Sequence, residues 1–293
     1  MRRSFGLTAA AALTVLAAGL AAQTPPDLGE VLARVGERIA EYYKRAQNVI
    51  CLEKSTMQPI GWNWSPEGFT RVTESELHIE WDAGDGDGPG EARVVRELRK
   101  INGRAPREKD KKDRAACTDP NPLSPEPLVF LLPSHRSEYK FTSAGIGKGK
   151  DRNTLIIDYT FVAAERKPQL IADPGGHEDC YDWSGPLAAK GRVWVDANTY
   201  DVVRVERRTL GPLDVRVPIA LQQRRSFGDR VVVEREDLTI RYKIVAFTDP
   251  EEAMLLPESI DELILVHGGL QSTRRSQTFS DYRRFVTGAR LIK

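Results

Sequence analysis

Several short segments of the sequence bring together residue types that could bind a metal or a phosphate. In GHEDC, residues 176–180, a histidine, two carboxylates and a cysteine are adjacent. A zinc site usually takes several His or Cys ligands at separated spacings. The remaining histidines, His78, His135 and His267, lie in segments without a partner motif. We therefore predict no metal site.

Two glycine-rich segments are better explained as loops than as ligand sites. GIGKGK, residues 145–150, lacks the four-residue spacing of a phosphate loop, and DRNTLIIDYTF follows it, which is typical of a strand and not of a helix. DAGDGDGPGE, residues 82–91, has carboxylates and glycines as a calcium loop does. The twelfth residue, counted from either possible first aspartate, is Arg93 or Arg96, where an EF-hand has glutamate.

The sequence contains no catalytic motif. An enzyme needs a nucleophile with a base, or paired carboxylates, within reach of one another. The elbow G-x-S-x-G, the zinc motif H-E-x-x-H and the phosphate loop are all absent from the chain. We therefore expect a non-enzymatic protein without a cofactor. The two tryptophans of GWNW, residues 61–64, lie in an expected loop, where they either cover the mouth of a cavity or pack on a sheet edge.

The N-terminal residues are typical of a secretory signal peptide. Arg2 and Arg3 precede an apolar run that ends in small residues, and cleavage after Ala21 or Ala22 fits the small-residue rule. The choice between Sec and twin-arginine export stays open. We expect removal of residues 1–22 and a single periplasmic or secreted domain over residues 23–293. No second apolar run approaches the ~20 residues of a membrane helix, so no integral membrane segment is expected after cleavage.

The charge balance and the cysteines narrow the class of protein. The 43 basic and 42 acidic residues give a net charge of +1, which does not fit a nucleic-acid binder. An exported chain meets an oxidising compartment, so Cys117 and Cys180, both in polar, turn-rich segments, are candidates for a disulfide that the sequence leaves open. Cys51 begins an apolar strand and is predicted to be a small core residue.

One amphipathic helix is predicted over residues 27–48. Asp27 suits the N-cap with Glu30 three residues on, and Lys44 and Arg45 suit the C-terminal end of the helix dipole. The apolar residues recur at spacings of three and four and form one stripe, which needs a surface to lie against: Leu28, Val31, Leu32, Val35, Ile39, Tyr42, Tyr43 and Ala46.

Most of the remaining chain shows the period-two alternation of strands with one buried face. The alternation runs through residues 77–81, 155–161 and 238–246, where Leu238, Ile240, Tyr242, Ile244 and Ala246 share the predicted inner side. VWVDANTYDVVRVERR, residues 193–208, is predicted to be a hairpin with a loop of about four residues. Its inner face would carry Val193, Val195, Val203 and Val205, and its outer face Arg192, Trp194, Asp196, Arg204 and Glu206. PEPLVFLLP, residues 125–133, is expected to form one or two helical turns.

The sequence thus predicts a mainly β (α+β) protein with a curved antiparallel sheet, because alternating strands exclude a sheet covered on both faces. Four stretches also resemble the periplasmic lipoprotein-carrier superfamily of LolA, LolB and the sigma-factor regulator RseB. They are KGRVWVDANTYDVVRVERR, residues 190–208; VVRELRKINGR, residues 94–104, as a second hairpin; and LLPESIDELILV with QTFSDYRRF, ending at Phe285, as closing strands. The resemblance implies an unclosed half-barrel around the N-terminal helix, with a hydrophobic cavity between.

The resemblance also implies a function. LolA-like members carry acyl chains of lipoproteins, and RseB-like members sense envelope components and bind a regulator. We expect a binding protein for a lipid, a lipoprotein acyl chain or another apolar ligand. The alternative is an envelope-stress sensor or interaction scaffold with an envelope protein as partner and no bound lipid. The ligand-cavity candidates are Val35, Ile39, Leu155, Ile157, Val195, Val205, Ile240 and Tyr242.

Overall fold

The structure, a computed structural model, describes residues 26–45, 49–82, 91–107, 126–148, 153–163, 168–172, 181–184, 188–224, 228–248 and 251–284. The signal peptide, the GHEDC segment, Cys117, Cys180 and most of the glycine-rich segment at 82–91 lie outside them. The predictions made for those residues stay predictions.

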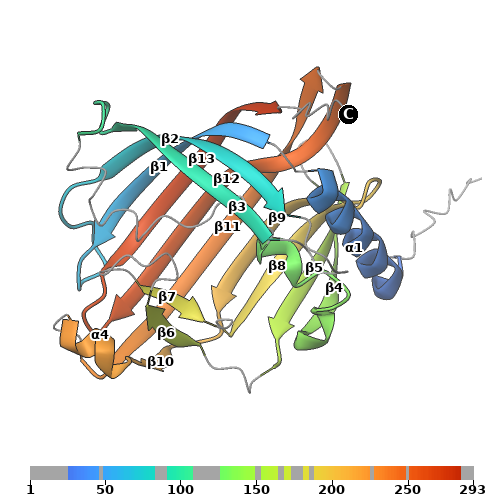
Figure 1. Ribbon diagram of the computed structural model, residues 1–293. Coiled ribbons are helices and arrows are strands. Elements are labelled where there is room, and N and C mark those ends of the chain that lie inside the picture. Colours follow the sequence, from blue (N-terminus) through green and yellow to red (C-terminus); the bar gives the residue numbers. More distant parts are fainter. Residues whose placement is uncertain are drawn as a thin grey trace, which may run out of the picture.

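One antiparallel sheet dominates the described residues (Figure 1). Its strands follow the order β3-β2-β1-β13-β12-β11-β9-β8-β5-β4, with β10 paired to β11, and β6 pairs β7 in a separate small sheet. The strands are β1 (Val49–Ile60), β2 (Arg71–Asp82), β3 (Glu91–Ile101), β4 (Tyr139–Lys148), β5 (Asn153–Phe161), β6 (Gln169–Ala172), β7 (Tyr181–Ser184), β8 (Ala189–Asp196), β9 (Val202–Thr209), β10 (Leu213–Arg216), β11 (Arg230–Thr248), β12 (Glu251–His267) and β13 (Ser272–Arg284).

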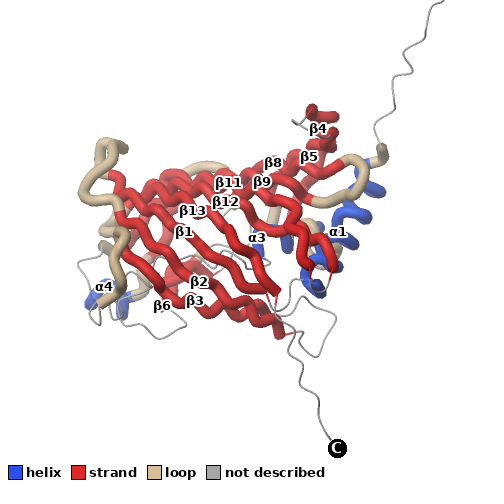
Figure 2. The backbone as a smooth tube through the Cα atoms, turned by 90° about the horizontal axis from the view of Figure 1, so that it is seen from above, coloured by secondary structure: helices blue, strands red, loops and turns tan. Residues whose placement is uncertain are grey.

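The sheet curves strongly but does not close. Figure 2 shows it from above as an arc, and β3 and β4 at the two ends of the strand order do not pair with each other. The inner face follows from the alternation of the long strands, and the curvature from the twist of the strands and from register shifts between them. The predicted fold class, an unclosed half-barrel of antiparallel strands, is therefore confirmed.

The helix α1 (Leu28–Arg45) covers one half of the inner face. The Glu30 amide donates to Asp27 Oδ1 at 3.0 Å, which confirms the predicted cap. The helix packs against β5, β8 and β9 together with the short α3 (Glu126–Val129), on one side of the arc in Figure 2. This first core contains Val31, Leu32, Val35, Ile39, Leu128, Phe130, Leu131, Leu132, Leu155, Ile157, Tyr159, Val193, Val195, Val202 and Val205.

A second core lies under the other half of the sheet. Its buried residues come from β1, β2, β11, β12 and β13, with Tyr42 as the packing contact from α1. Cys51 is fully buried there, as the sequence predicts for a core thiol, and burial raises its pKa to about 12. The remaining members are Val49, Leu77, Ile240, Phe247, Met254, Leu256, Ile260 and Phe279.

The predicted hairpin at residues 193–208 forms β8 and β9. Val193, Val195 and Val205 are 0–2% exposed and face the helix. The pairing register shifts between Trp194 and Val195, and this irregularity makes Val202 the buried residue in place of Val203. The prediction for Val203 was therefore wrong.

Two outer-face residues of the same hairpin behave differently. Trp194 packs outside between two arginines, with the Arg204 guanidinium 4.5 Å and that of Arg192 5.9 Å from its ring. Asp196, expected on the outer face, is buried, because its Oδ1 accepts hydrogen bonds from the amides of Asn198 and Thr199 in the turn. A turn aspartate that caps the backbone in this way need not face water.

The predicted face of β11 continues through Tyr242 to Ile244, since both side chains lie toward α1, but solvent reaches its end. Ile244 is 53% exposed and Ala246 is exposed, whereas Phe247 is buried in the second core. The register with β12 shifts between Arg241 and Tyr242, so the β11–β12 hairpin bends before its tip. At the tip Phe247 is therefore the buried residue, while Tyr242 and Ile244 stay on the side toward α1.

The structure also tests the predictions made for three shorter segments. Residues 145–148 of GIGKGK belong to β4, not to a loop, with a bulge next to Gly145. VVRELRKINGR, predicted to be a hairpin, forms the end of β3, which pairs with β2, and a tight turn in which the Ile101 amide donates to the Arg104 carbonyl at 2.9 Å. Among the residues described up to 107, no second strand follows this turn. The apolar segment at 125–133 forms α3 and buries Leu128 and Leu131, as expected of helical turns, and η2 (Arg136–Glu138) and α4 (Ile219–Arg224) complete the described helices.

Arg136 fixes α1 at a close contact. Its Nε donates to the Leu131 carbonyl at 2.8 Å, its Nη2 donates to the Leu32 carbonyl in the middle of α1, and burial lowers its pKa. The guanidinium passes directly over Gly36, where a Cβ atom would collide with it. Glycine is therefore needed here for its lack of a side chain and not for its backbone freedom.

Gly36→Ala is expected to lower the free energy of unfolding by about 1–3 kcal/mol, because the added methyl displaces the Arg136 guanidinium. The gain in helix propensity, about 1 kcal/mol, does not offset this. Urea unfolding followed by circular dichroism measures the loss. Gly211→Ala is the control, since no heavy atom lies within 4 Å of a Cβ added at that position. Stabilisation by Gly36→Ala would contradict the contact.

Candidate functional site

A pocket of about 210 Å³ opens between α1 and the tip of the β11–β12 hairpin. Five residues of α1 form one wall, and the loop before β9, the start of β9 and α3 close the sides. The pocket is lined by Arg38, Ile39, Glu41, Tyr42, Arg45, Leu128, Asp201, Val202, Tyr242, Ile244, Ala253, Met254 and Leu255.

The floor of the pocket is apolar. Ile39, Val202 and Met254 are each at most 3% exposed, and Ile244 and Leu255 extend the apolar surface outward. Burial raises the pKa of both Tyr42 and Tyr242, so their phenols stay neutral at physiological pH. The floor thus presents hydrocarbon and neutral hydroxyl groups to a ligand.

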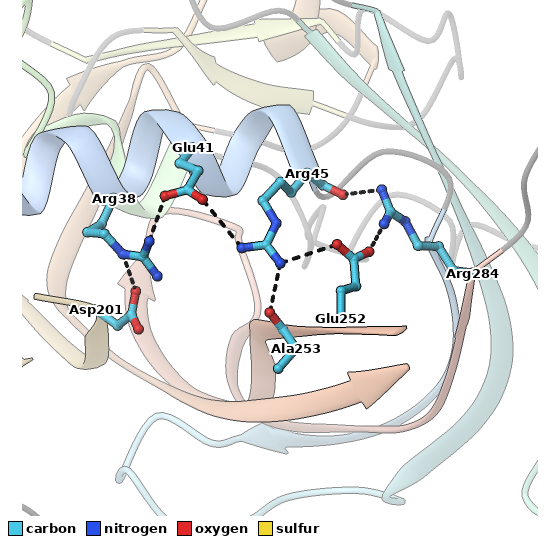
Figure 3. Close-up of polar contacts among 7 residues, drawn as sticks. All are labelled: Arg38, Glu41, Arg45, Asp201, Glu252, Ala253 and Arg284. Atoms are coloured by element: carbon cyan, nitrogen blue, oxygen red, sulfur yellow. Dashed lines mark hydrogen bonds and ion pairs between the residues drawn. The ribbon is translucent and has the colours of Figure 1, made fainter. Parts of the chain in front are cut away.

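The rim of the pocket is a chain of alternating charges, drawn in Figure 3. Arg38 Nε donates to Asp201 Oδ1 at 3.0 Å, and its Nη1 donates to Glu41 Oε2 at 2.6 Å. Arg45 lies between two further carboxylates: its Nη1 is 3.5 Å from Glu41 Oε1, and its Nη2 is 3.2 Å from Glu252 Oε2. The hydrogen bond with Asp201 raises the pKa of Arg38. Three arginines balance three carboxylates once Arg284 is counted, so the rim has no net charge.

The same rim attaches the helix to the sheet. Arg45 Nη2 donates to the Ala253 carbonyl at 2.9 Å, and Arg284 Nη2 donates to the Arg45 carbonyl at 2.9 Å (Figure 3). Arg284 also pairs with Glu252, and both side chains are 18% exposed. The pairs of Glu41 with Arg38 and Arg45 are more exposed, and such pairs contribute only about 0–1 kcal/mol each. The C-terminal half of α1 is thus held by several contacts of different strength.

The predicted cavity residues divide among three places. Ile39 and Tyr242 line this pocket, and Val205 lines a second pocket of about 130 Å³ beside Tyr139, Tyr159 and Arg207. The others are packed into the two cores, namely Val35, Leu155, Ile157 and Val195 in the first and Ile240 in the second. A role in ligand contact stays a prediction for all eight.

Sequence reasoning missed the charged rim and the hairpin tip. Arg38, Glu41 and Arg45 recur at spacings of three and four on α1, immediately beside Ile39 and Tyr42. That pattern placed charges at the border of the apolar stripe and was the available signal. Asp201, Glu252 and Arg284 carried no such signal, because they meet the helix only after the sheet has curled.

A row of charged and amide side chains crosses the inner face of the sheet. We call this row the polar band; its members are Arg96, Glu53, Gln277, Arg275, Glu262, Arg207 and Glu236. Arg96 donates to both carboxylate oxygens of Glu53 at 2.8 and 3.3 Å, and Gln277 Nε2 donates to Glu53 at 2.6 Å. Arg275 pairs with Glu262 at 3.5 Å, and Arg207 pairs with Glu236.

The polar band occupies the inner phase of its strands. Gln277 lies two residues from buried Phe279, and Glu262 lies two residues from buried Ile260. Burial raises the pKa of Glu262. The expectation of an apolar inner face was therefore incomplete, since a charge inside this face must be paired to be tolerated. The apolar part of the inner face therefore lies on the helix side of the band.

Glu76, His78 and Glu97 place three ligand atoms within 4.8 Å of one another on β2 and β3. Arg99 and Arg283 already pair with Glu76 at 3.3 and 3.0 Å, and Arg99 pairs with Glu97 at 3.0 Å. The arginines neutralise the carboxylates, so the group is a surface ion-pair network.

Among the described residues, no helix has the length and apolar content that a membrane crossing requires.

No protein-family model and no curated protein matches the chain. Solved structures do resemble it. The LolA superfamily protein from Nitrosomonas europaea has 10% identity and a TM-score of 0.35, with 87% of this chain and 94% of that chain covered. A putative outer membrane lipoprotein-sorting protein domain from Vibrio parahaemolyticus has 11% identity and a TM-score of 0.34, with 87% and 94% covered. MucB in complex with MucA(peri) has 10% identity and a TM-score of 0.22, with 89% and 100% covered.

These structures come from the superfamily that the sequence resembles. At identities near 10% and TM-scores of 0.22 to 0.35, the similarity says nothing about the function of this chain. The function of this chain therefore has to be argued from its own side chains.

Proposed function

We propose that this chain is an exported, non-enzymatic binding protein for an apolar ligand, such as an acyl chain of a lipid or lipoprotein. The observation that carries the proposal is the pocket beside α1, which combines an apolar floor with an opening to the surface. Binding sites are typically concave and mostly apolar, with a few polar groups at defined places. The expected signal peptide places the protein in the periplasm or outside the cell.

The size of the pocket selects the shape of the ligand. Drug-sized ligands occupy pockets of roughly 300–1,000 Å³, and this pocket measures about 210 Å³. A single extended hydrocarbon chain fits such a volume better than a branched or fused-ring ligand. The bulk of a lipid would stay outside, at the charged rim.

The chemistry of the pocket favours binding over catalysis. Its arginines and carboxylates are paired with each other, and burial keeps its two tyrosines protonated. A nucleophile next to a free base is absent from the described lining. These groups can therefore hold a chain and exclude water without activating a bond.

Ile244→Glu tests the pocket directly. Ile244 lines the pocket and is 53% exposed, so the change should leave the fold intact while placing a charge against the bound chain. We expect saturable binding of a fluorescent fatty acid by delipidated protein, and at least tenfold weaker binding by the variant. Fluorescence titration measures both. Ile146→Glu, at an equally exposed isoleucine of β4 outside the pocket lining, is the matched control and should bind normally.

Two outcomes would contradict the proposal. Wild-type protein without saturable binding would exclude a carrier, and equal weakening by both variants would place the effect outside the pocket. The first outcome would support the second candidate, an envelope-stress sensor or interaction scaffold that acts through its surface. The observation behind that candidate is that two cores and the polar band fill much of the inner face.

A further inference from the structure

Three aromatic side chains protrude from the loop between β1 and β2. We call residues 61–70 the aromatic loop. Trp62 is 86% exposed, Phe69 is 96% exposed and Trp64 is 44% exposed. Water-exposed aromatic rings of this size are unfavourable for a soluble protein unless another surface covers them. The sequence predicted that the tryptophans either cover the mouth of a cavity or pack on a sheet edge. Trp62 does neither, since it lines no described pocket and is 86% exposed.

The aromatic loop holds a defined conformation despite its exposure. The Gly61 amide donates to the Ser65 carbonyl at 2.8 Å, and the Glu67 amide donates to the Pro59 carbonyl at 2.9 Å. Asn63 Oδ1 accepts from the amide and the hydroxyl of Ser65 at 3.2 and 2.6 Å. Trp64 has a φ of 63°, a conformation that costs a bulky residue free energy. The loop therefore presents its rings without further ordering.

The aromatic loop lies far from the pocket. The Trp64 ring is 5.1 Å from the ring of His267, which ends β12, whereas the pocket is lined by Ala253 to Leu255 at the start of β12. Thirteen strand residues at ~3.3 Å each separate the two by about 40 Å. In Figure 2 the loops at this end of the sheet lie opposite α1. The loop is thus a separate surface from the proposed ligand site.

We propose that the aromatic loop inserts into the interfacial layer of a phospholipid bilayer. Large aromatic side chains bury about 150–250 Å² each, so Trp62 and Phe69, which are 86% and 96% exposed, offer roughly 300–500 Å², below the ~800 Å² per partner of a stable protein interface. A fluid bilayer needs no complementary shape and accepts side chains that project from a loop. Tryptophan is enriched at membrane–water interfaces, and Glu67 is the one charged residue of the loop.

Flotation of the purified protein with unilamellar vesicles of phosphatidylcholine and one-fifth phosphatidylglycerol tests the insertion. We expect the wild type to float with the vesicles, and the double variant Trp62→Ala/Phe69→Ala to lose at least nine-tenths of the bound fraction. Ile146→Ala, which removes an exposed side chain from β4, is the control and should float like the wild type. Thermal unfolding checks that all three proteins are folded.

The outcomes separate this proposal from the proposed ligand site. Fatty-acid binding should survive the loss of both aromatic residues, and flotation should survive Ile244→Glu. Wild-type protein that stays unbound, or an equal loss in the control, would overturn the insertion. Association with native envelope membranes but not with protein-free vesicles would identify a protein as the partner of the loop and would overturn it as well.

Discussion

Val205→Asp is expected to leave no folded protein at 25 °C. Val205 is 2% exposed, lies between Val193 of β8 and Ile240 of β11, and faces the helix side of the sheet. A carboxylate there must either be buried in its charged form or take up a proton, and each costs several kcal/mol. The neighbouring cation on this face, Arg207, is already paired with Glu236. The loss approaches the ~5–15 kcal/mol that stabilises a typical domain.

Near-ultraviolet circular dichroism and urea unfolding measure this effect. Val95→Asp is the matched control, because Val95 also lies in a strand but is 42% exposed. The control should change the free energy of unfolding by less than about 1 kcal/mol. A Val205→Asp protein with the urea midpoint of the wild type would show that the β9 face does not pack on α1.

Ile240→Ala is expected to lower the free energy of unfolding by about 2–5 kcal/mol. Ile240 is 2% exposed and lies opposite both Val205 of β9 and Ile260 of β12, at the centre of the strand order. Removing three carbon atoms there leaves a cavity that the two rigid neighbouring strands cannot collapse to fill. The shift of the urea midpoint at unchanged slope gives the magnitude.

Arg241→Ala tests the face assignment beside it. Arg241 pairs with Asp261 at 3.0 Å, and both side chains are about half exposed. Such a pair contributes at most about 1 kcal/mol, so Arg241→Ala should cost far less than Ile240→Ala. Comparable losses in the two variants would mean that the inner and outer faces of β11 are exchanged.

Local patterns predicted the fold well because each depends on neighbours in sequence. The stripe of α1, its Asp27 cap and the alternation of β5, β8 and β11 all express periods that a short segment contains. Prediction failed wherever two distant strands decided the outcome. Val203 was misplaced because a register shift changes the phase of the alternation, and no residue type marks that shift reliably. Ile244 lies beside Tyr242 as predicted but is 53% exposed, which the alternation does not show.

The candidate site was harder to predict than the fold. Of its rim, only Arg38, Glu41 and Arg45 share one helix and could be recognised as a charged border. The polar band could not be predicted from the sequence, for a different reason. Glu53 and Glu262 each interrupt an apolar alternation, and a glutamate in such a position is normally assigned to the solvent side. Here an arginine on another strand neutralises the charge of each glutamate.

The strand order has a consequence for biogenesis. β1 has only β2 and β13 as neighbours, so the first three strands reach the rest of the sheet solely through β13, more than 200 residues later in the chain. While the chain is being synthesised, the edges of β1 and β12 that pair with β13 stay unpaired until β13 has been made. Pairings of such sequence separation fold slowly. The sheet can therefore be completed only after β13, the last strand in the sequence, has been synthesised.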